Sequence, residues 1–175
     1  MNKFLGIIIC FCAFACTSNS KKTQEPDLIM HFNLVWAVSE KDNNPDMDRN
    51  AQFIISGYQE LVKGIAQKDT SYIKEYSLLL FKTSDSLGTL KISKDTAMQE
   101  AWVNGLGNIS NELQGLLESN AQGDKKELSN TFNMLSVQML NWLAAIGYKQ
   151  RTIYIFNAPN EYIEDGIYWF GIQKK

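Results

Sequence analysis

Apolar and polar residues change their period along the chain, and these changes divide it into predicted strands and helices. Between Met30 and Val38 the larger apolar residues alternate, and this period of two favours a strand with one buried face. The same run would also suit a short buried helix. Residues 40–48 are rich in acidic and amide residues around Pro45, which predicts a loop.

From Arg49 to Gly147 apolar residues recur at steps of three and four, the pattern of amphipathic helices. The sequence predicts four such helices. Their expected inward residues are Ala51, Ile54, Ile55, Tyr58, Leu61, Val62, Ile65 and Ala66; Tyr72, Ile73, Tyr76, Leu79, Leu80 and Leu87; Met98, Ala101, Trp102, Leu106, Ile109, Leu113, Leu116 and Leu117; and Leu128, Phe132, Leu135, Met139, Trp142, Leu143 and Ile146.

Polar capping residues mark the starts of the last three helices. The second is expected to begin at Asp69 or Thr70 and the third at Ser93 or Asp95. Asp124 opens the fourth, where Glu127 completes a capping-box spacing. Gly88 and Gly147 are expected to end the second and fourth helices.

Glycines interrupt the predicted third helix. Gly105 and Gly107 would each cost about 1 kcal/mol relative to alanine. A close helix contact would offset that cost.

Alternation returns after Gly147. Ile153 to Phe156 and Ile167 to Ile172 alternate around the turn signal Asp165-Gly166, which predicts a hairpin. The expected fold class is therefore mainly α: a four-helix bundle with a C-terminal β-hairpin, to which the N-terminal run would add an optional strand.

The first fifteen residues have the parts of a signal peptide. Lys3 precedes an apolar run of twelve residues, whereas a membrane-spanning helix needs roughly 20. The run ends in Ala13-Phe14-Ala15-Cys16, which resembles a lipobox, although leucine is commoner at the place of Ala13. We therefore expect a signal peptide over 1–15 and a diacylglycerol on Cys16. The alternative is an ordinary secretory signal cut nearby, which would leave Cys16 as a free thiol.

The remaining chain divides into a polar tether over 16–27 and a single domain over 28–175. Cys10 and Cys12 would leave with the signal peptide. The mature chain then lacks the cysteines that a disulfide framework, a thiolate zinc site or a cysteine nucleophile requires.

Charge argues against a nucleic-acid partner. The full chain has 17 basic and 19 acidic residues, and loss of Lys3 leaves 16 basic residues, a net charge of −3 before His31 is considered. Basic residues form only short pairs such as Lys21-Lys22 and Lys125-Lys126, whereas nucleic-acid binding needs a dense cationic face.

Candidate chemistry is sparse. His31 is the single histidine, so it has no imidazole or thiolate partner for a transition-metal site or a nucleophilic mechanism. No phosphate-binding loop is present, and we expect no cofactor. The loop from Asn157 to Gly166 is rich in hard oxygen ligands but matches no known calcium-loop spacing. Acid–base chemistry by a pair of carboxylates stays open.

Several motifs resemble one bacterial family of periplasmic domains of unknown function. They are the Ala101-Trp102 pair, the segment Phe132 to Ser136, and Pro159 with Gly166-Ile167-Tyr168-Trp169, within a likeness that covers residues 53–171. Members of that family occur alone in lipoproteins or fused to the membrane-fusion adaptors of copper and heavy-metal efflux pumps. The resemblance implies a fold and an envelope location.

The same resemblance places four family ligands at positions where this chain has other residues. This chain has Ala158 where the family has a cysteine and Asn160 where the family has a methionine. It has Gln99 and Thr131 where the family has histidines. These substitutes offer no soft donor for Cu(I). If a pocket survives, we expect it near Gln99, Trp102, Thr131 and Asn160, with no bound metal and no catalytic residues.

The sequence thus predicts a non-enzymatic lipoprotein, anchored by Cys16 and acting as a binding or accessory module for an envelope protein or a small ligand. We expect an anchor in the outer membrane. Lys21-Lys22 after the cysteine, in place of an acidic run, favours a position facing the periplasm, by analogy with surface-export signals in related lipoproteins. Two alternatives stand beside it: a copper or heavy-metal accessory protein that uses methionine or oxygen ligands, and a carboxylate-dependent enzyme.

Overall fold

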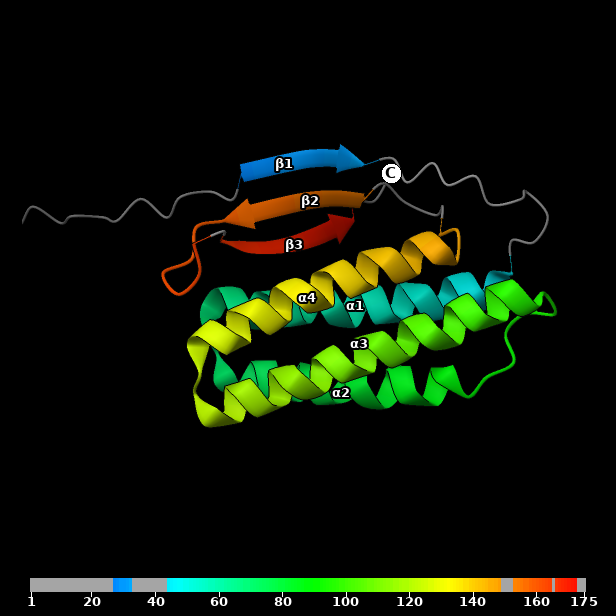
Figure 1. Cartoon of the computed structure of the whole chain (residues 1–175), viewed down its shortest axis with the longest axis horizontal. Coiled ribbons are helices and arrows are strands. Elements are labelled where there is room, and N and C mark those ends of the chain that lie inside the picture. The colour runs from blue at the N-terminus through cyan, green and yellow to red at the C-terminus, as the bar shows by residue number, and fades with distance from the viewer. Residues whose placement is uncertain (1–26, 33–43, 149–152, 165, 173–175) are drawn as a thin grey trace, which may run out of the picture.

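The computed structural model describes residues 27–32, 44–148, 153–164 and 166–172. In this part of the chain the helices are α1 (Pro45–Gln67), α2 (Thr70–Gly88), α3 (Thr96–Gln122) and α4 (Lys125–Ala145). The strands are β1 (Asp27–Phe32), β2 (Ile153–Ala158) and β3 (Ile167–Ile172). The predicted class, a mainly helical fold with a C-terminal hairpin, is confirmed (Figure 1).

Side-chain caps set the helix starts. Asp69, Asp95 and Asp124 cap α2, α3 and α4 by accepting backbone N–H bonds from the first turn, as the sequence predicts. The prediction that the loop continues to Asp48 is wrong, because α1 already begins at Pro45. Asn44 caps that helix by accepting from the Asp46 backbone N–H, and proline suits the first helical position, whose N–H has no partner within the helix.

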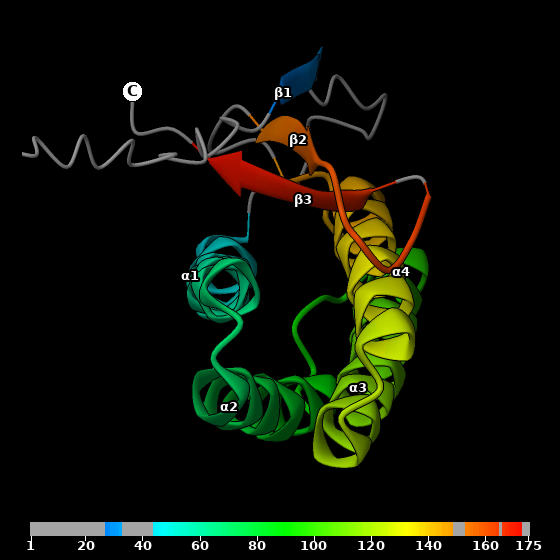
Figure 2. The same ribbon diagram turned by 90° about the vertical axis from the view of Figure 1, so that its left-hand side faces the viewer.

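The helices follow one another around the bundle, and the sheet lies over its remaining side. Helix α3 packs against both α2 and α4, and α1 packs against α2. Figure 2, which looks along the helices, shows α1 and α4 apart, with β3 crossing over the space between them. In both views β3 is the strand nearest the helices and β1 the farthest. The sheet therefore meets the bundle through β3.

The sheet is antiparallel, in the order β1-β2-β3. In the hairpin, Ile153 pairs with Ile172 and Ala158 with Ile167. The optional N-terminal strand is present as β1, but it runs over Asp27–Phe32 and overlaps the predicted run only from Met30. The rest of that run, 33–38, lies outside the described residues.

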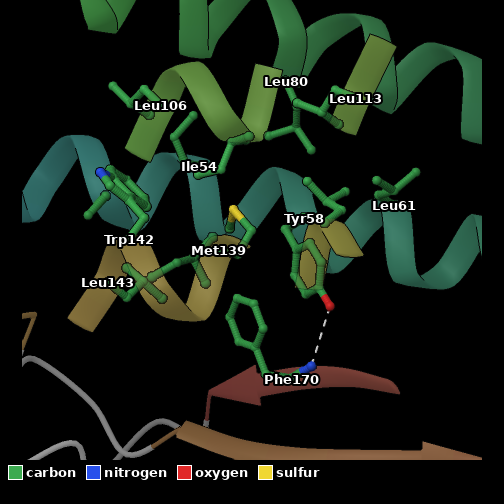
Figure 3. Packing of buried hydrophobic residues seen from close by; sticks show 14 of the residues in the cluster. Ile54, Tyr58, Leu61, Leu80, Leu106, Leu113, Met139, Trp142, Leu143 and Phe170 are labelled. Carbon is green, nitrogen blue, oxygen red and sulfur yellow. Dashed lines mark hydrogen bonds between the residues drawn. The ribbon is translucent and has the colours of Figure 1, made fainter. Parts of the chain in front are cut away.

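The buried core matches three of the four predicted stripes closely. Trp102, Leu106, Leu113, Trp142 and Leu143 are among its members, as Figure 3 shows for several of them. Helix α2 differs, because its inward residues are Ile73, Ser77, Leu80 and Ser84. Leu79, predicted to lie inward, is 43% exposed.

Gly105 and Gly107 of α3 have different surroundings. A Cβ on Gly105 would overlap Cδ1 of Trp142, so only glycine lets the indole pack against this turn of α3. A Cβ on Gly107 would meet nothing within 4 Å. The expected close helix contact therefore exists at Gly105 and not at Gly107.

Candidate functional site

The junction between sheet and bundle is built from polar side chains of α1 and α4. Asn133 donates from Nδ2 to the carbonyl of Gly166 (3.0 Å) and accepts the amide of Tyr168 at Oδ1 (2.8 Å). Ser136 Oγ lies 3.0 Å from the carbonyl of Tyr168. The amide of Phe170 donates to the hydroxyl of Tyr58 (3.4 Å). We call Tyr58, Asn133, Ser136, Tyr168 and Phe170 the docking seam.

These bonds use the edge of β3 that does not pair with β2. Backbone groups of Gly166, Tyr168 and Phe170 receive side-chain partners where another strand would otherwise pair. An edge strand presents a row of such groups, and covering them prevents pairing with another chain. The β3 edge is therefore closed by the protein's own helices.

Hydrogen-bond directions follow from the proton count at Tyr58 and Ser136. Their oxygens lie 2.6 Å apart. Ser136 has one proton, and the carbonyls of Phe132 and Tyr168, each 3.0 Å from its hydroxyl oxygen, can only accept it. Tyr58 must therefore donate to Ser136 while it accepts from Phe170. The hydroxyl thus links α1, α4 and β3 through one oxygen.

Burial determines the ionisation of this hydroxyl. Tyr58 is fully buried, and this desolvation raises its pKa well above the ordinary value of 10.0, against the smaller lowering effect of the bond from the Phe170 amide. The group is therefore neutral at physiological pH. Its position and charge state suit a structural role.

Gln99 and Trp102, two of the four predicted pocket residues, fix the connection between α2 and α3. Gln99 accepts the amides of Ile92 and Ser93 at Oε1 and donates to the carbonyl of Leu90. The indole N–H of Trp102 donates to the carbonyl of Leu87 (3.0 Å). These two residues lie about one turn apart on α3. Backbone groups of the connection bond to Gln99, and the last turn of α2 accepts the bond from Trp102.

The other two predicted pocket residues lie elsewhere. Thr131 packs its methyl group against Gly115 of α3, and its hydroxyl lies 3.5 Å from the carboxylate of Glu127. Gly115 is sixteen residues beyond Gln99, which a rise of 1.5 Å per residue converts to roughly 24 Å along α3. Gln99 and Thr131 are therefore near opposite ends of the helix pair.

Asn160 belongs to the loop between β2 and β3. Its side-chain oxygen accepts the amides of Tyr162 and Ile163, which makes a local turn. The neighbouring Glu161 pairs with Lys68 at 2.7 Å, and this bond lowers the pKa of the Glu161 carboxyl. The oxygen-rich loop is thus partly engaged in its own folding and in contact with the end of α1.

Two further sequence predictions concern residues whose side chains the structure does not describe. Cys16 lies outside the described residues, as do the predicted signal peptide and most of the tether. His31 is placed only by its backbone, opposite Tyr154 of β2. Within the described ranges, no group of three or more histidine, cysteine, aspartate or glutamate side chains could hold a metal ion. None of the helices described is long and apolar enough to cross a bilayer.

Comparisons with protein-family models, curated proteins and solved structures found no match. The resemblance to the efflux-associated family stays a prediction based on the motifs themselves.

Sequence reasoning missed the docking seam. Ser136 and Asn133 flank the apolar stripe of α4, where a serine or an asparagine gives no signal of its own. The signal that could have found it is the pair Asn133 and Ser136, which lies within one helical turn of Phe132 in a sequence that also indicates a hairpin. Such a pair is well placed to bond a strand edge.

Proposed function

We propose that this chain is a non-enzymatic envelope lipoprotein in which a helical scaffold, held to a membrane through Cys16, presents a small sheet to a partner protein. The observation that carries the proposal is the asymmetry of the sheet. Its β3 edge is closed by the docking seam, whereas β1 is the outer strand and the first described element after Cys16.

The outer strand suits recognition of an extended peptide segment. Among the described residues no strand pairs with the far edge of β1. A partner segment in extended conformation would add to this edge through main-chain hydrogen bonds, a recurring mode of peptide recognition. Because β1 pairs with β2 and β2 with β3, the added strand would be supported by the whole sheet.

The membrane attachment also fits this geometry. Eleven steps separate Cys16 from Asp27, so the chain between them spans at most about 40 Å. The anchor would therefore keep β1 close to the bilayer, within reach of other envelope proteins. Two or more acyl chains give stable anchoring, whereas one holds only marginally.

Three of the residues near the expected pocket, together with Tyr58 of the docking seam, have contacts that suit a scaffold. Gln99, Trp102 and Asn160 bond to nearby backbone groups, and Tyr58 is neutral and buried. Each therefore has a role in holding the fold. This arrangement favours binding at a surface over chemistry in an interior site.

Cell fractionation tests the membrane attachment. We expect the full chain to sediment with bacterial membranes and the variant Cys16→Ser to be released into the soluble fraction. Cys10→Ser is the matched control, because Cys10 lies within the leader, and it should behave like the unaltered chain. Equal sedimentation of all three would contradict anchoring through Cys16.

Site-specific photo-cross-linking in intact cells tests the binding surface. A cross-linker at His31 should give one discrete product with another envelope protein, while a cross-linker at Asn111, exposed on α3, should not. Equal labelling at both positions would count against the β1 edge. Stoichiometric retention of copper or zinc through a weak chelator would instead favour the metal-accessory alternative.

A further inference from the structure

The solvent side of α1 carries a regular stripe of residues. Its members are spaced alternately three and four apart, opposite the buried stripe that contains Tyr58, and they are Asp46, Arg49, Phe53, Ser56, Glu60 and Lys63. Phe53 is 56% exposed, more than any other large hydrophobic residue in the described part of the chain. Neither the docking seam nor the proposed lipid anchor explains an exposed phenylalanine here.

Two ion pairs flank Phe53 and Ser56 on this stripe. Arg49 pairs with Asp46 at 3.3 Å, and Lys63 pairs with Glu60 at 2.5 Å. Three of these four side chains are more than half exposed, and that of Glu60 is 33% exposed. From its N-terminal end the stripe therefore has the order acid, base, phenylalanine, serine, acid, base.

This order is complementary to its own reverse. We propose that α1 of a second copy of this chain packs antiparallel along the stripe and forms a symmetric dimer. In that register Asp46 lies opposite Lys63 of the second copy, and Arg49 opposite Glu60 of the second copy. Phe53 lies opposite Ser56 of the second copy. A parallel pairing would instead place each charge opposite its like.

The centre of the stripe can be buried without an unpaired polar group. Ser56 already donates its hydroxyl to the carbonyl of Gln52 at 2.8 Å, so a phenyl ring above it leaves that bond intact. Serine is also small, which lets the ring of the second copy approach the helix. Two phenylalanines would lose solvent contact in one dimer, because the two-fold symmetry repeats each contact.

The dimer should be weak in solution and stronger on a membrane. Exposed ion pairs contribute about 1 kcal/mol or less each, and the apolar centre is small. Confinement by the proposed lipid anchor raises the effective concentration of the two copies. The charge pattern therefore mainly sets the orientation of the pair.

Charge reversal tests the register in the full chain. Two differently tagged copies are expressed together and treated with a chemical cross-linker in the intact membranes, where the anchor confines them. The membranes are then solubilised in detergent, and co-purification of one tag with the other is measured. Arg49→Glu in both copies places two carboxylates opposite each other at both symmetry-related contacts, and Glu60→Arg in both copies places two guanidinium groups there. Each should lower co-purification by about tenfold.

The decisive sample combines the two variants. One copy carries Arg49→Glu and the other carries Glu60→Arg. In this mixed pair one of the two symmetry-related contacts joins the new glutamate to the new arginine, so it is attractive with its charges reversed. The other contact keeps its native arginine and glutamate. Co-purification should therefore return to the level of the unaltered chain. Phe53→Ala should lower it, and Lys82→Glu, on the exposed face of α2, should not change it. The proposal fails if unaltered copies do not co-purify, if the single variants have no effect, or if the mixed pair stays as weak as each variant alone.

Discussion

The rings of Tyr58 in α1 and Phe170 in β3 stack with their centroids 4.4 Å apart and their planes within 9°, although 112 positions separate them in the chain. Phe132 of α4 lies on the same stack, 5.9 Å from Tyr58. The C-terminal strand thus supplies an aromatic side chain to the space between α1 and α4 (Figure 3). The sheet completes the core of the bundle.

Removal of the Tyr58 hydroxyl should make the protein less stable at neutral pH and less sensitive to alkali. Tyr58→Phe leaves the buried amide of Phe170 without its acceptor, a loss of about 1–2 kcal/mol in the free energy of unfolding. Above pH 10 the unfolded chain loses the tyrosine proton while the native state keeps it. Native stability then falls by about 1.4 kcal/mol per pH unit for this group.

Urea unfolding of both proteins between about pH 8 and 11 checks this linkage. The stability of the unaltered protein should fall more steeply above pH 10 than that of Tyr58→Phe. Parallel curves would show that this hydroxyl does not ionise differently in the two states.

Asn133 should hold the start of β3 through both of its hydrogen bonds. Asn133→Ala leaves the Tyr168 amide and the Gly166 carbonyl without partners, which should cost about 1–3 kcal/mol. Hydrogen exchange at the Tyr168 amide should become faster, because that amide loses its hydrogen-bond acceptor. Asn141→Ala, on the exposed side of the same helix, is the control and should leave that exchange rate unchanged.

Gly105 and Gly107 of α3 should respond in opposite directions to alanine. Gly105→Ala forces a methyl group into the Trp142 indole and should destabilise the protein by about 1–3 kcal/mol. Gly107→Ala has open space and should stabilise the helix by about 0.5–1 kcal/mol. Thermal unfolding measures both. A gain of stability in Gly105→Ala would contradict the close contact between α3 and α4.

Gln99 should act on the connection between α2 and α3. Gln99→Ala removes the acceptor for two amides and the donor to Leu90, so we expect a loss of about 1–3 kcal/mol and faster hydrogen exchange at Ile92 and Ser93. Gln114→Ala, on the exposed side of α3, should change stability by no more than about 0.5 kcal/mol and leave that exchange unaltered. Unaltered exchange in Gln99→Ala would reopen the question of a ligand role.

Periodicity predicted most of the fold because long apolar stripes and acidic caps act locally. It failed in α2, where Leu78, Leu79 and Leu80 are consecutive and leave the helical phase undecided. Only Leu80 is buried, and Ser77 and Ser84 complete the inward stripe. Serine is nearly neutral in a hydrophobic pattern, so its use at a helix contact gives no signal.

The candidate site was harder to predict than the core. The alternation of β3 indicates which residues share a face, but not which helices cover the strand edge. The contacts of Tyr58 and Asn133 with β3 join segments far apart in the chain. The four expected pocket residues come from a motif likeness, which carries no information on how far Gln99 of α3 lies from Thr131 of α4.

Intact-mass measurement of the protein extracted from bacterial membranes tests the central claim most directly. The lipoprotein account predicts a chain that begins at Cys16, lacks residues 1–15 and carries the mass of a diacylglycerol on that cysteine. A chain that retains residues 1–15, begins at another position or has an unmodified Cys16 would contradict it.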